Sequence, residues 1–239
     1  MPTCSIAIAL PSVEMTTPPT TRPRCPQCLR ALSNCICALA QPVPPHVQVR
    51  ILQYPMEVHE AKGTARLLHL CLPGSRMAVG EQFDAEALAH LLHAPWQTGD
   101  SPRHAVLLYP ETDAASAVPP PPARSTGLPA SAIRLVVIDG TWRKSRKMLY
   151  NNPPLQQLPR LALDDGAAGR YRIRKAHRPG QYSTMEAATQ ALCQLAGAAQ
   201  ASAIYEPLDR VFADLLAQLE RQRPAHTMVH AGLAAGPSA

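Results

Sequence analysis

The segment RLVVIDGTWRKSRKM (134–148) contains a buried strand that passes directly into a basic helix. The apolar run Leu135–Ile138 predicts the strand, which ends at Asp139. In an open α/β sheet, ligands bind at the carboxyl ends of the strands. The carboxylate of Asp139, the hydroxyl of Thr141 and the indole of Trp142 are therefore predicted at the edge where such a sheet does chemistry.

The same residues also fit a plain strand-to-helix turn. In that interpretation Asp139 or Thr141 is the N-cap of the helix and Trp142 packs in the core. Both interpretations are open when this segment is considered alone.

Strands and helices alternate along the chain, which predicts an α/β fold with a mostly parallel sheet and helices on both faces. Residues 42–225 are expected to form this domain, with a proline-rich loop of no fixed structure at 112–132 and flexible tails at 1–22 and 226–239. Apolar spacing predicts strands at 47–53, 76–79, 105–109, 135–138, 161–163 and 171–173, and helices at 62–72, 84–93, 142–150, 183–199 and 207–221.

Four of the seven cysteines lie close together before this domain, within residues 23–41. Their pattern is C-x2-C-x6-C-x-C, and such spacing lets four thiolates converge on one tetrahedral Zn²⁺. Four protein ligands leave no open position on the metal, so a structural zinc knuckle is expected. The alternative is a set of free or redox-active thiols. The ligands would be Cys25, Cys28, Cys35 and Cys37.

The net charge of +6 and a pI near 9.1 suggest a polyanionic partner, with RNA and DNA the first candidates. No apolar run approaches the length that crosses a bilayer, and no convincing targeting segment is present. A cytoplasmic protein without membrane attachment or an obligate protein partner is expected. The basic residues expected to contact RNA are Arg143 and Lys144 in the helix after Asp139, and Arg172, Arg174 and Lys175 in RYRIRKAHR (170–178).

The segment QYSTMEAA (181–188) carries Ser183 and Glu186 at the spacing of a capping box. The same helix N-terminus, with the Thr184 hydroxyl, could instead bind a carboxylate or phosphate. Glu57 and Glu111, like Asp139, follow predicted strand ends, so a parallel sheet would bring some of these carboxylates to one rim.

Five segments, in this order, resemble the DTW-domain family, the tRNA-uridine aminocarboxypropyltransferases. They are RCPQCLRALSNCIC, ILQYPMEVHEAKGTARLL, LLYPE, VVIDGTWRKSRKM and YRIRKAHRPGQYSTMEAA, and they cover most of the chain. One departure is Gly63, where the family pattern leads us to expect Asn. The proline-rich loop is also longer than in the pattern.

The resemblance implies a SPOUT-like α/β domain, a fold whose C-terminal part can be knotted, that binds S-adenosylmethionine. It further implies transfer of the 3-amino-3-carboxypropyl group to N3 of a tRNA uridine in the variable loop, with release of 5′-methylthioadenosine. The catalytic residues would be Asp139, Thr141 and Trp142, with Asp139 as general base toward uridine N3–H. The cofactor-binding residues would be Glu111, Asp139, Trp142, Ser183, Thr184 and Glu186.

Two other functions fit the same residues. A SPOUT-type RNA methyltransferase would use the same S-adenosylmethionine, since the sulfonium activates every attached carbon and the pocket decides which one reacts. A non-enzymatic, zinc-containing RNA-binding protein would use the knuckle and the basic segments alone.

Overall fold

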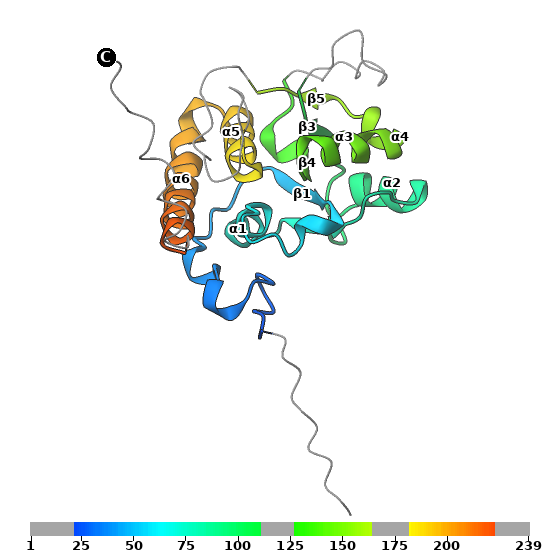
Figure 1. The fold of residues 1–239 in the computed structure, drawn as a ribbon. Coiled ribbons are helices and arrows are strands. Elements are labelled where there is room, and N and C mark those ends of the chain that lie inside the picture. The colour runs from blue at the N-terminus through cyan, green and yellow to red at the C-terminus, as the bar shows by residue number, and fades with distance from the viewer. Residues whose placement is uncertain (1–21, 111–126, 164–181, 223–239) are drawn as a thin grey trace, which may run out of the picture.

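The computed structural model describes residues 22–110, 127–163 and 182–222 (Figure 1). Its centre is a five-stranded, entirely parallel sheet in the order β2-β1-β4-β3-β5. The predicted α/β class with a parallel sheet is therefore confirmed. The strands are β1 (Gln48–Gln53), β2 (Arg76–Val79), β3 (His104–Leu108), β4 (Ile133–Asp139) and β5 (Arg160–Leu161).

The helices cover both faces of this sheet. The alternation of side chains along β4 divides the core, because Leu135 and Val137 point to one face and Val136 to the other. The first face is packed against α1 (Ala65–Cys71), α5 (Thr184–Ala196) and α6 (Ala198–Arg221). The second is packed against α2 (Ala85–His93), α3 (Trp142–Asn151) and the short α4 (Pro153–Gln156).

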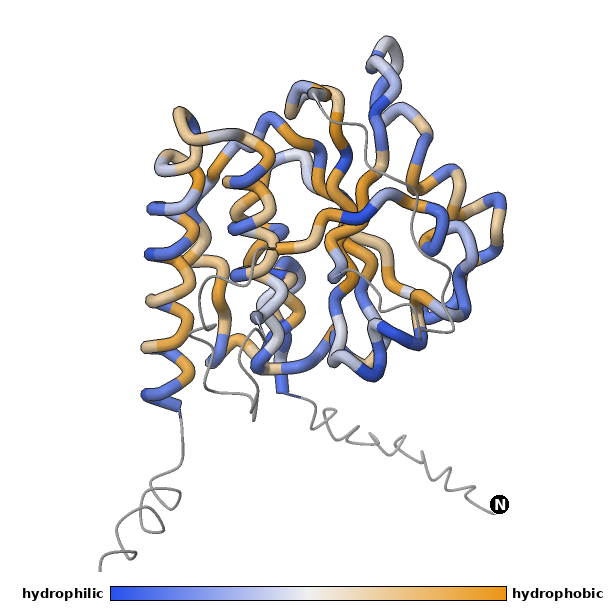
Figure 2. Tube along the Cα trace, turned by 90° about the horizontal axis from the view of Figure 1, so that it is seen from above, coloured by the Kyte–Doolittle hydropathy of each residue, from blue (hydrophilic) through white to orange (hydrophobic). Residues whose placement is uncertain are grey.

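Hydropathy along the chain follows this layering. Figure 2 shows the apolar stretches gathered in the interior, and the leftmost helix, α6, turns its hydrophilic residues outward. Burial of Leu208, Val211 and Leu215 on the inner side of α6 accounts for its amphipathic sequence. Among the described residues, no helix combines the length and apolar composition needed to cross a membrane.

The boundary between the last two helices differs from the prediction. The chain turns at Gly197, whose φ of 77° and ψ of 169° form a conformation open essentially to glycine alone. The final helix starts at Ala198 and continues through Pro207, where the sequence predicted a new helix to begin. Proline removes one hydrogen bond, but burial of Ile204 and Leu208 on either side holds the helix together.

Smaller differences occur near the predicted proline-rich loop and at β5. Ala130–Ala132 form a 3₁₀ turn that leads into β4, so these residues have regular structure although the predicted loop extends to 132. β5 is Arg160–Leu161 rather than 161–163. Most of the predicted loop, the strand at 171–173 and the two tails lie outside the described residues. The predicted knot depends on the path of residues 164–181, which are also outside them, and it stays a prediction.

The connections leave β1 and β4 in opposite directions. After β1 the chain crosses one face through α1 to β2, whereas after β4 it crosses the other face through α3 to β5. These two strands are neighbours, with Gln53 in register with Asp139 at their carboxyl ends. Ligands of parallel α/β sheets bind at such a switch point. The region around Gln53, Asp139 and the start of α3 is therefore the candidate site, and we call it the crevice.

Candidate functional site

The carboxylate of Asp139 lies at this switch point, held by two side chains from distant parts of the chain. Asp139 is only 4% exposed. Its Oδ2 accepts a hydrogen bond of 2.9 Å from Gln53 Nε2, and its Oδ1 accepts one of 2.6 Å from the Thr184 hydroxyl. One donor on each oxygen fixes the plane of the carboxylate, as a reacting group requires.

The N-terminus of α5 is fastened to the same site. Ser183 and Glu186 form the predicted capping box, with hydrogen bonds of 3.2 Å and 2.8 Å between each side chain and the other's backbone N–H. The N–H of Met185 donates to the buried hydroxyl of Thr64 at 3.1 Å. Protein oxygens therefore already accept from several N–H groups of this first turn, while Thr184 directs its hydroxyl to Asp139.

The start of α3 supplies the exposed part of the site. Thr141 is the N-cap of α3, and its hydroxyl accepts a hydrogen bond from Lys144 N at 3.4 Å. Of the two caps that the sequence left open, the structure therefore has Thr141 and not Asp139. Trp142 is 45% exposed, which excludes the alternative that it packs in the core. Its ring meets the buried Tyr109 edge to face, with centroids 6.0 Å apart and planes at 74°. An exposed indole can offer its face to a cation or a base.

Lys144 turns back from α3 to a buried carboxylate. Its Nζ lies 2.9 Å from Oε1 of Glu57, whose side chain is 3% exposed, and 5.2 Å from the centre of the Tyr54 ring. Arg143 on the same helix is exposed. Of the two α3 cations predicted to contact RNA, one therefore stabilises the crevice and the other faces solvent.

We expect Lys144→Met to lower the free energy of unfolding by about 1–3 kcal/mol, because the buried Glu57 carboxylate loses its cation. Thermal unfolding measures the loss. The double variant Glu57→Gln/Lys144→Met should recover most of it, since no buried charge then needs a partner. Strictly additive losses in the two single variants would contradict this account.

A second carboxylate, that of Glu81, links Tyr54 to helix α3. Glu81 accepts a hydrogen bond from the Tyr54 hydroxyl and lies 2.6 Å from Lys147 Nζ. Lys147 and the Tyr54 hydroxyl hold the pKa of Glu81 below its ordinary value of 4.5. The same contacts raise the pKa of Tyr54 and of Lys147.

The lowered pKa of Glu81 predicts a stability contribution that is lost in acid. Since the pKa in the folded protein lies below that of the unfolded chain, the contribution is complete above pH 4.5 and disappears as the pH falls through the folded-state value. Thermal unfolding of wild type and Glu81→Gln should therefore differ at neutral pH and converge in acid. Glu220→Gln, on the exposed face of α6, is the control. A difference between wild type and Glu81→Gln that persists in acid would refute the prediction.

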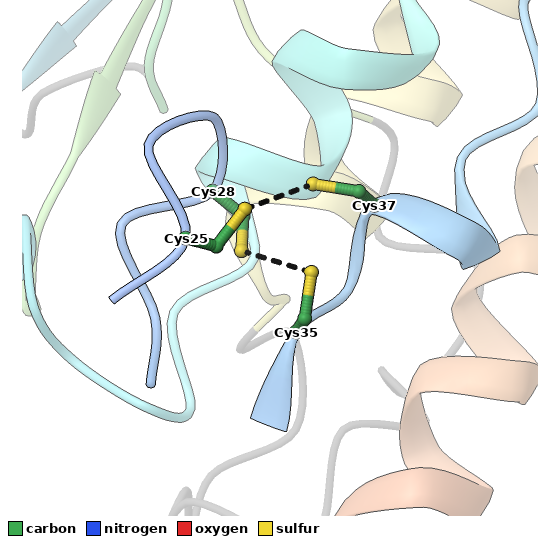
Figure 3. Close-up of side chains that lie close together, drawn as sticks. All are labelled: Cys25, Cys28, Cys35 and Cys37. Atoms are coloured by element: carbon green, nitrogen blue, oxygen red, sulfur yellow. Dashed lines mark hydrogen bonds between the residues drawn. The ribbon is translucent and has the colours of Figure 1, made fainter. Parts of the chain in front are cut away.

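The four cysteines form a compact cluster, shown in Figure 3. All four Sγ atoms lie within 4.8 Å of one another, with Cys25 and Cys37 at 3.6 Å and Cys28 and Cys35 at 3.7 Å. Sulfur atoms around a tetrahedral zinc stand about 3.8 Å apart when each Zn–S bond is about 2.3 Å. A disulfide would need about 2.05 Å. The donor set and its spacing thus fit a four-thiolate metal ion.

The backbone prepares one of these sulfurs for ionisation. N–H groups of Cys28 and Gln27 lower the pKa of the Cys25 thiol to about 6. Burial, with a further contribution from Cys25, raises the pKa of Cys37 to about 12. Thiolates this close repel one another, so all four ionise together only around a cation.

Direct contacts join the knuckle to α6 and to the turn that precedes α1. In Figure 1 the knuckle is the blue segment below α1 and α6, and Gln218 of α6 donates to the Cys35 carbonyl at 3.2 Å. Arg30, which is 7% exposed, donates to the Gly63 carbonyl at 2.6 Å, next to Thr64. A Cβ at Gly63 would stand 3.1 Å from the Glu60 carbonyl oxygen, so an asparagine here would need this turn to shift.

The structure therefore brings Asp139, Thr184, Thr141 and Trp142 to one edge of the sheet. Glu111, Arg172, Arg174 and Lys175 lie outside the described residues. Gln53 was missed as a site residue, although a polar side chain at the end of a buried strand was the available signal. Tyr109 was also missed, because no pattern in the neighbouring sequence predicts its contact with Trp142.

The sequence model of the DTW domain family matches residues 22–220 of this chain. The matched range includes both the cysteine cluster and the crevice. The chain belongs to the DTW domain family. No solved structure gives a significant match to it.

Curated relatives of this DTW domain protein carry the name tRNA-uridine aminocarboxypropyltransferase 2, which makes them transferases. The relative from Drosophila melanogaster is 34% identical over 184 residues, covering 74% of this chain and 68% of its own length. Those from Macaca fascicularis and Mus musculus are each 27% identical over 175 residues, covering 72% of this chain. The match spans only 56% of the length of these two mammalian relatives.

Proposed function

We propose that this protein is a tRNA-modifying transferase that moves the 3-amino-3-carboxypropyl group of S-adenosylmethionine to N3 of a tRNA uridine in the variable loop. The buried carboxylate of Asp139, held by Gln53 and Thr184 at the switch point of the sheet, is the observation that carries this proposal. The names of the curated relatives give the same reaction class.

The reaction needs a proton acceptor beside the uracil ring. Uridine N3 loses its proton to Asp139 and attacks the γ-carbon of the donor. The bond between that carbon and sulfur breaks, its electron pair stays on sulfur, and neutral 5′-methylthioadenosine leaves. Because Gln53 and Thr184 already orient the carboxylate, it does not have to reorganise when the substrate arrives.

Gln53 has a further feature suited to this task. Its amide nitrogen faces Asp139, so its Oε1 points elsewhere, and this buried oxygen has no hydrogen-bond partner among the described residues. Buried acceptors are rarely left unsatisfied. We assign it to an N–H group of a bound substrate, which makes Gln53 a positioning residue.

The remaining site residues take the roles expected from the sequence. The exposed face of Trp142 offers a surface to the sulfonium, and Thr141 lies beside it at the rim of the crevice. Thr184 acts through its hydrogen bond to Asp139, and the capping residues Ser183 and Glu186 fix the helix start beside which we place the donor's amino acid part. Glu111 is assigned to the same part of the donor. The tRNA backbone is held by Arg143 at the rim and by Arg172, Arg174 and Lys175. Lys144, whose ammonium is paired with Glu57, is partly exposed and adds positive charge to the same surface.

The knuckle holds a structural zinc in this proposal. Cys25, Cys28, Cys35 and Cys37 would be its four ligands, and the metal would stabilise the segment that supports Thr64 through Arg30 and Gly63. Since four thiolates fill the coordination sphere, this zinc takes no part in the reaction.

The identity of the small-molecule product tests the proposal. The purified protein is incubated with S-adenosylmethionine and unmodified tRNA, and the product is identified by mass spectrometry. 5′-Methylthioadenosine with the corresponding mass gain on a uridine is the expected result. S-Adenosylhomocysteine would instead establish a methyltransferase, and tRNA binding without either product would favour an RNA-binding module.

A further inference from the structure

The opposite edge of the sheet contains a cavity that the proposed reaction does not use. It has a volume of about 370 Å³ and lies where β1 and β2 begin, at the amino ends of the strands. Its lining includes Arg76, Arg103, Trp96, Asp100 and Gln48. We call it the arginine cavity.

Three guanidinium groups surround the Trp96 ring beside this cavity. Those of Arg50, Arg76 and Arg134 stand 5.3, 5.0 and 4.9 Å from the ring centre. Arg103 adds a fourth guanidinium to the cavity wall. Cation–π contacts of this kind hold the arginines around one aromatic residue despite their mutual repulsion.

Two of the four arginines have a structural role. Arg134 is 1% exposed and donates to the carbonyls of Leu92 at 2.5 Å and Ala94 at 2.9 Å, while Arg50 donates to that of Leu91 at 3.2 Å. These carbonyls end helix α2, where a positive charge is favourable. The burial of Arg50 and Arg134 is therefore explained without a ligand.

The other two arginines are not explained in this way. Arg76 donates to the Trp96 carbonyl at 2.5 Å, and Arg103 makes a long contact of 3.4 Å with the His46 carbonyl. A guanidinium has five N–H donors. Each of these side chains therefore retains donors for which the described part of the protein supplies no acceptor, and both line the cavity.

Counter-charge around the cluster is limited to Asp100, whose negative charge acts on Arg134 against the larger effects of burial and of Arg103 and Arg76. No ion pair joins any of the four arginines to a carboxylate within the described residues. The one carboxylate in the lining, Asp100, accepts instead from the backbone N–H groups of Trp96 and Gln97, at 3.2 and 3.1 Å. Burial, followed by the charges of Arg134 and Arg76, lowers the pKa of Arg50 to about 10. A bound anion would offset this repulsion.

A further donor next to the cavity lacks an acceptor. The indole Nε1 of Trp96 is buried and has no hydrogen-bond partner among the described residues. Trp96 itself lines the cavity, so this indole donor lies near the guanidinium groups of Arg76 and Arg103. A phosphate group has the matching chemistry, because its negative oxygens accept two parallel hydrogen bonds from one guanidinium.

We propose that the arginine cavity binds a phosphate group, with Arg76 and Arg103 as its principal ligands. The phosphate belongs either to an RNA backbone or to a small phosphorylated molecule, since both present the same oxygens. The inference does not depend on the transferase activity, because binding at this edge is measured without turnover.

Titration calorimetry at low salt, with inorganic phosphate as the probe, tests the cavity. Arg76→Ala/Arg103→Ala should weaken binding by about tenfold or more, as expected for the loss of charged hydrogen bonds. The control, Arg210→Ala/Arg221→Ala on the exposed face of α6, removes the same charge and should leave the affinity within about twofold. Arg103→Ala alone, which gives up only one long contact, should weaken binding in the same direction and guards against a folding defect in the double variant.

Filter binding of tRNA with the same variants distinguishes the two sources. A loss of both phosphate and tRNA affinity, absent from the α6 control, identifies an RNA backbone phosphate. A loss of phosphate affinity alone identifies a small phosphorylated ligand. If the cavity variants match the α6 control with both probes, or if wild type binds neither, the proposal is overturned.

Discussion

Asp139→Asn should lower the rate of aminocarboxypropyl transfer by about 10²–10⁴-fold, the usual contribution of a general base. Asparagine fills the same space but cannot take the proton of uridine N3. The amide nitrogen of the introduced asparagine must also replace one of the two carboxylate oxygens. It then faces either Gln53 Nε2 or the Thr184 hydroxyl, each of which donates to an oxygen in wild type. The rate is measured as formation of 5′-methylthioadenosine with saturating tRNA.

Binding of S-adenosylmethionine to the same variant separates two roles for Asp139. Calorimetry should give a nearly unchanged affinity if the carboxylate acts on the uridine, and a large loss of affinity would reassign Asp139 to the donor. Asp84→Asn is the matched control, because Asp84 caps α2 through Glu86 N and Ala87 N and asparagine caps equally well. Transfer at the wild-type rate by Asp139→Asn would disprove the general-base assignment.

Cys28→Ser should abolish binding of the zinc that we assign to the knuckle and lower stability by about 3 kcal/mol or more, because metal binding at a four-cysteine site is coupled to folding. Cys28 is 1% exposed and its Sγ lies 3.7 Å from that of Cys35. The knuckle packs against α1 and α6, so its loss should also loosen those helices. Metal content is measured by mass spectrometry and stability by thermal unfolding.

Cys193→Ser is the control for this substitution, since Cys193 lies in α5 away from the cluster. It should retain one equivalent of zinc and lose little stability. Wild-type protein purified without metal, yet as stable as after zinc addition, would contradict the assignment. Loss of zinc should also lower transfer activity, because Arg30 of the knuckle holds Gly63 beside Thr64.

Local patterns were enough to predict how strands and helices alternate along the described chain, the four-cysteine cluster and the edge at which Asp139 lies. The reason is that periodicity, capping and close cysteine spacing act over a few residues, and each can be recognised within one segment. These patterns did not predict the order of the strands in the sheet. Prediction failed where packing outweighed a local signal. Pro207 indicated a helix start, yet its helix begins at Ala198 because the buried stripe on α6 extends beyond the proline.

The composition of the site depends on contacts between distant segments. Asp139 meets Gln53 across 86 positions and Thr184 across 45, and Lys144 reaches Glu57 across 87. The arginines around Trp96 likewise come from β1, β2 and β4. No short pattern encodes these partners, since strand register and helix packing decide which side chains share a crevice. The sequence therefore predicted the edge at which we place the reaction, and the folded arrangement showed which groups orient Asp139 there.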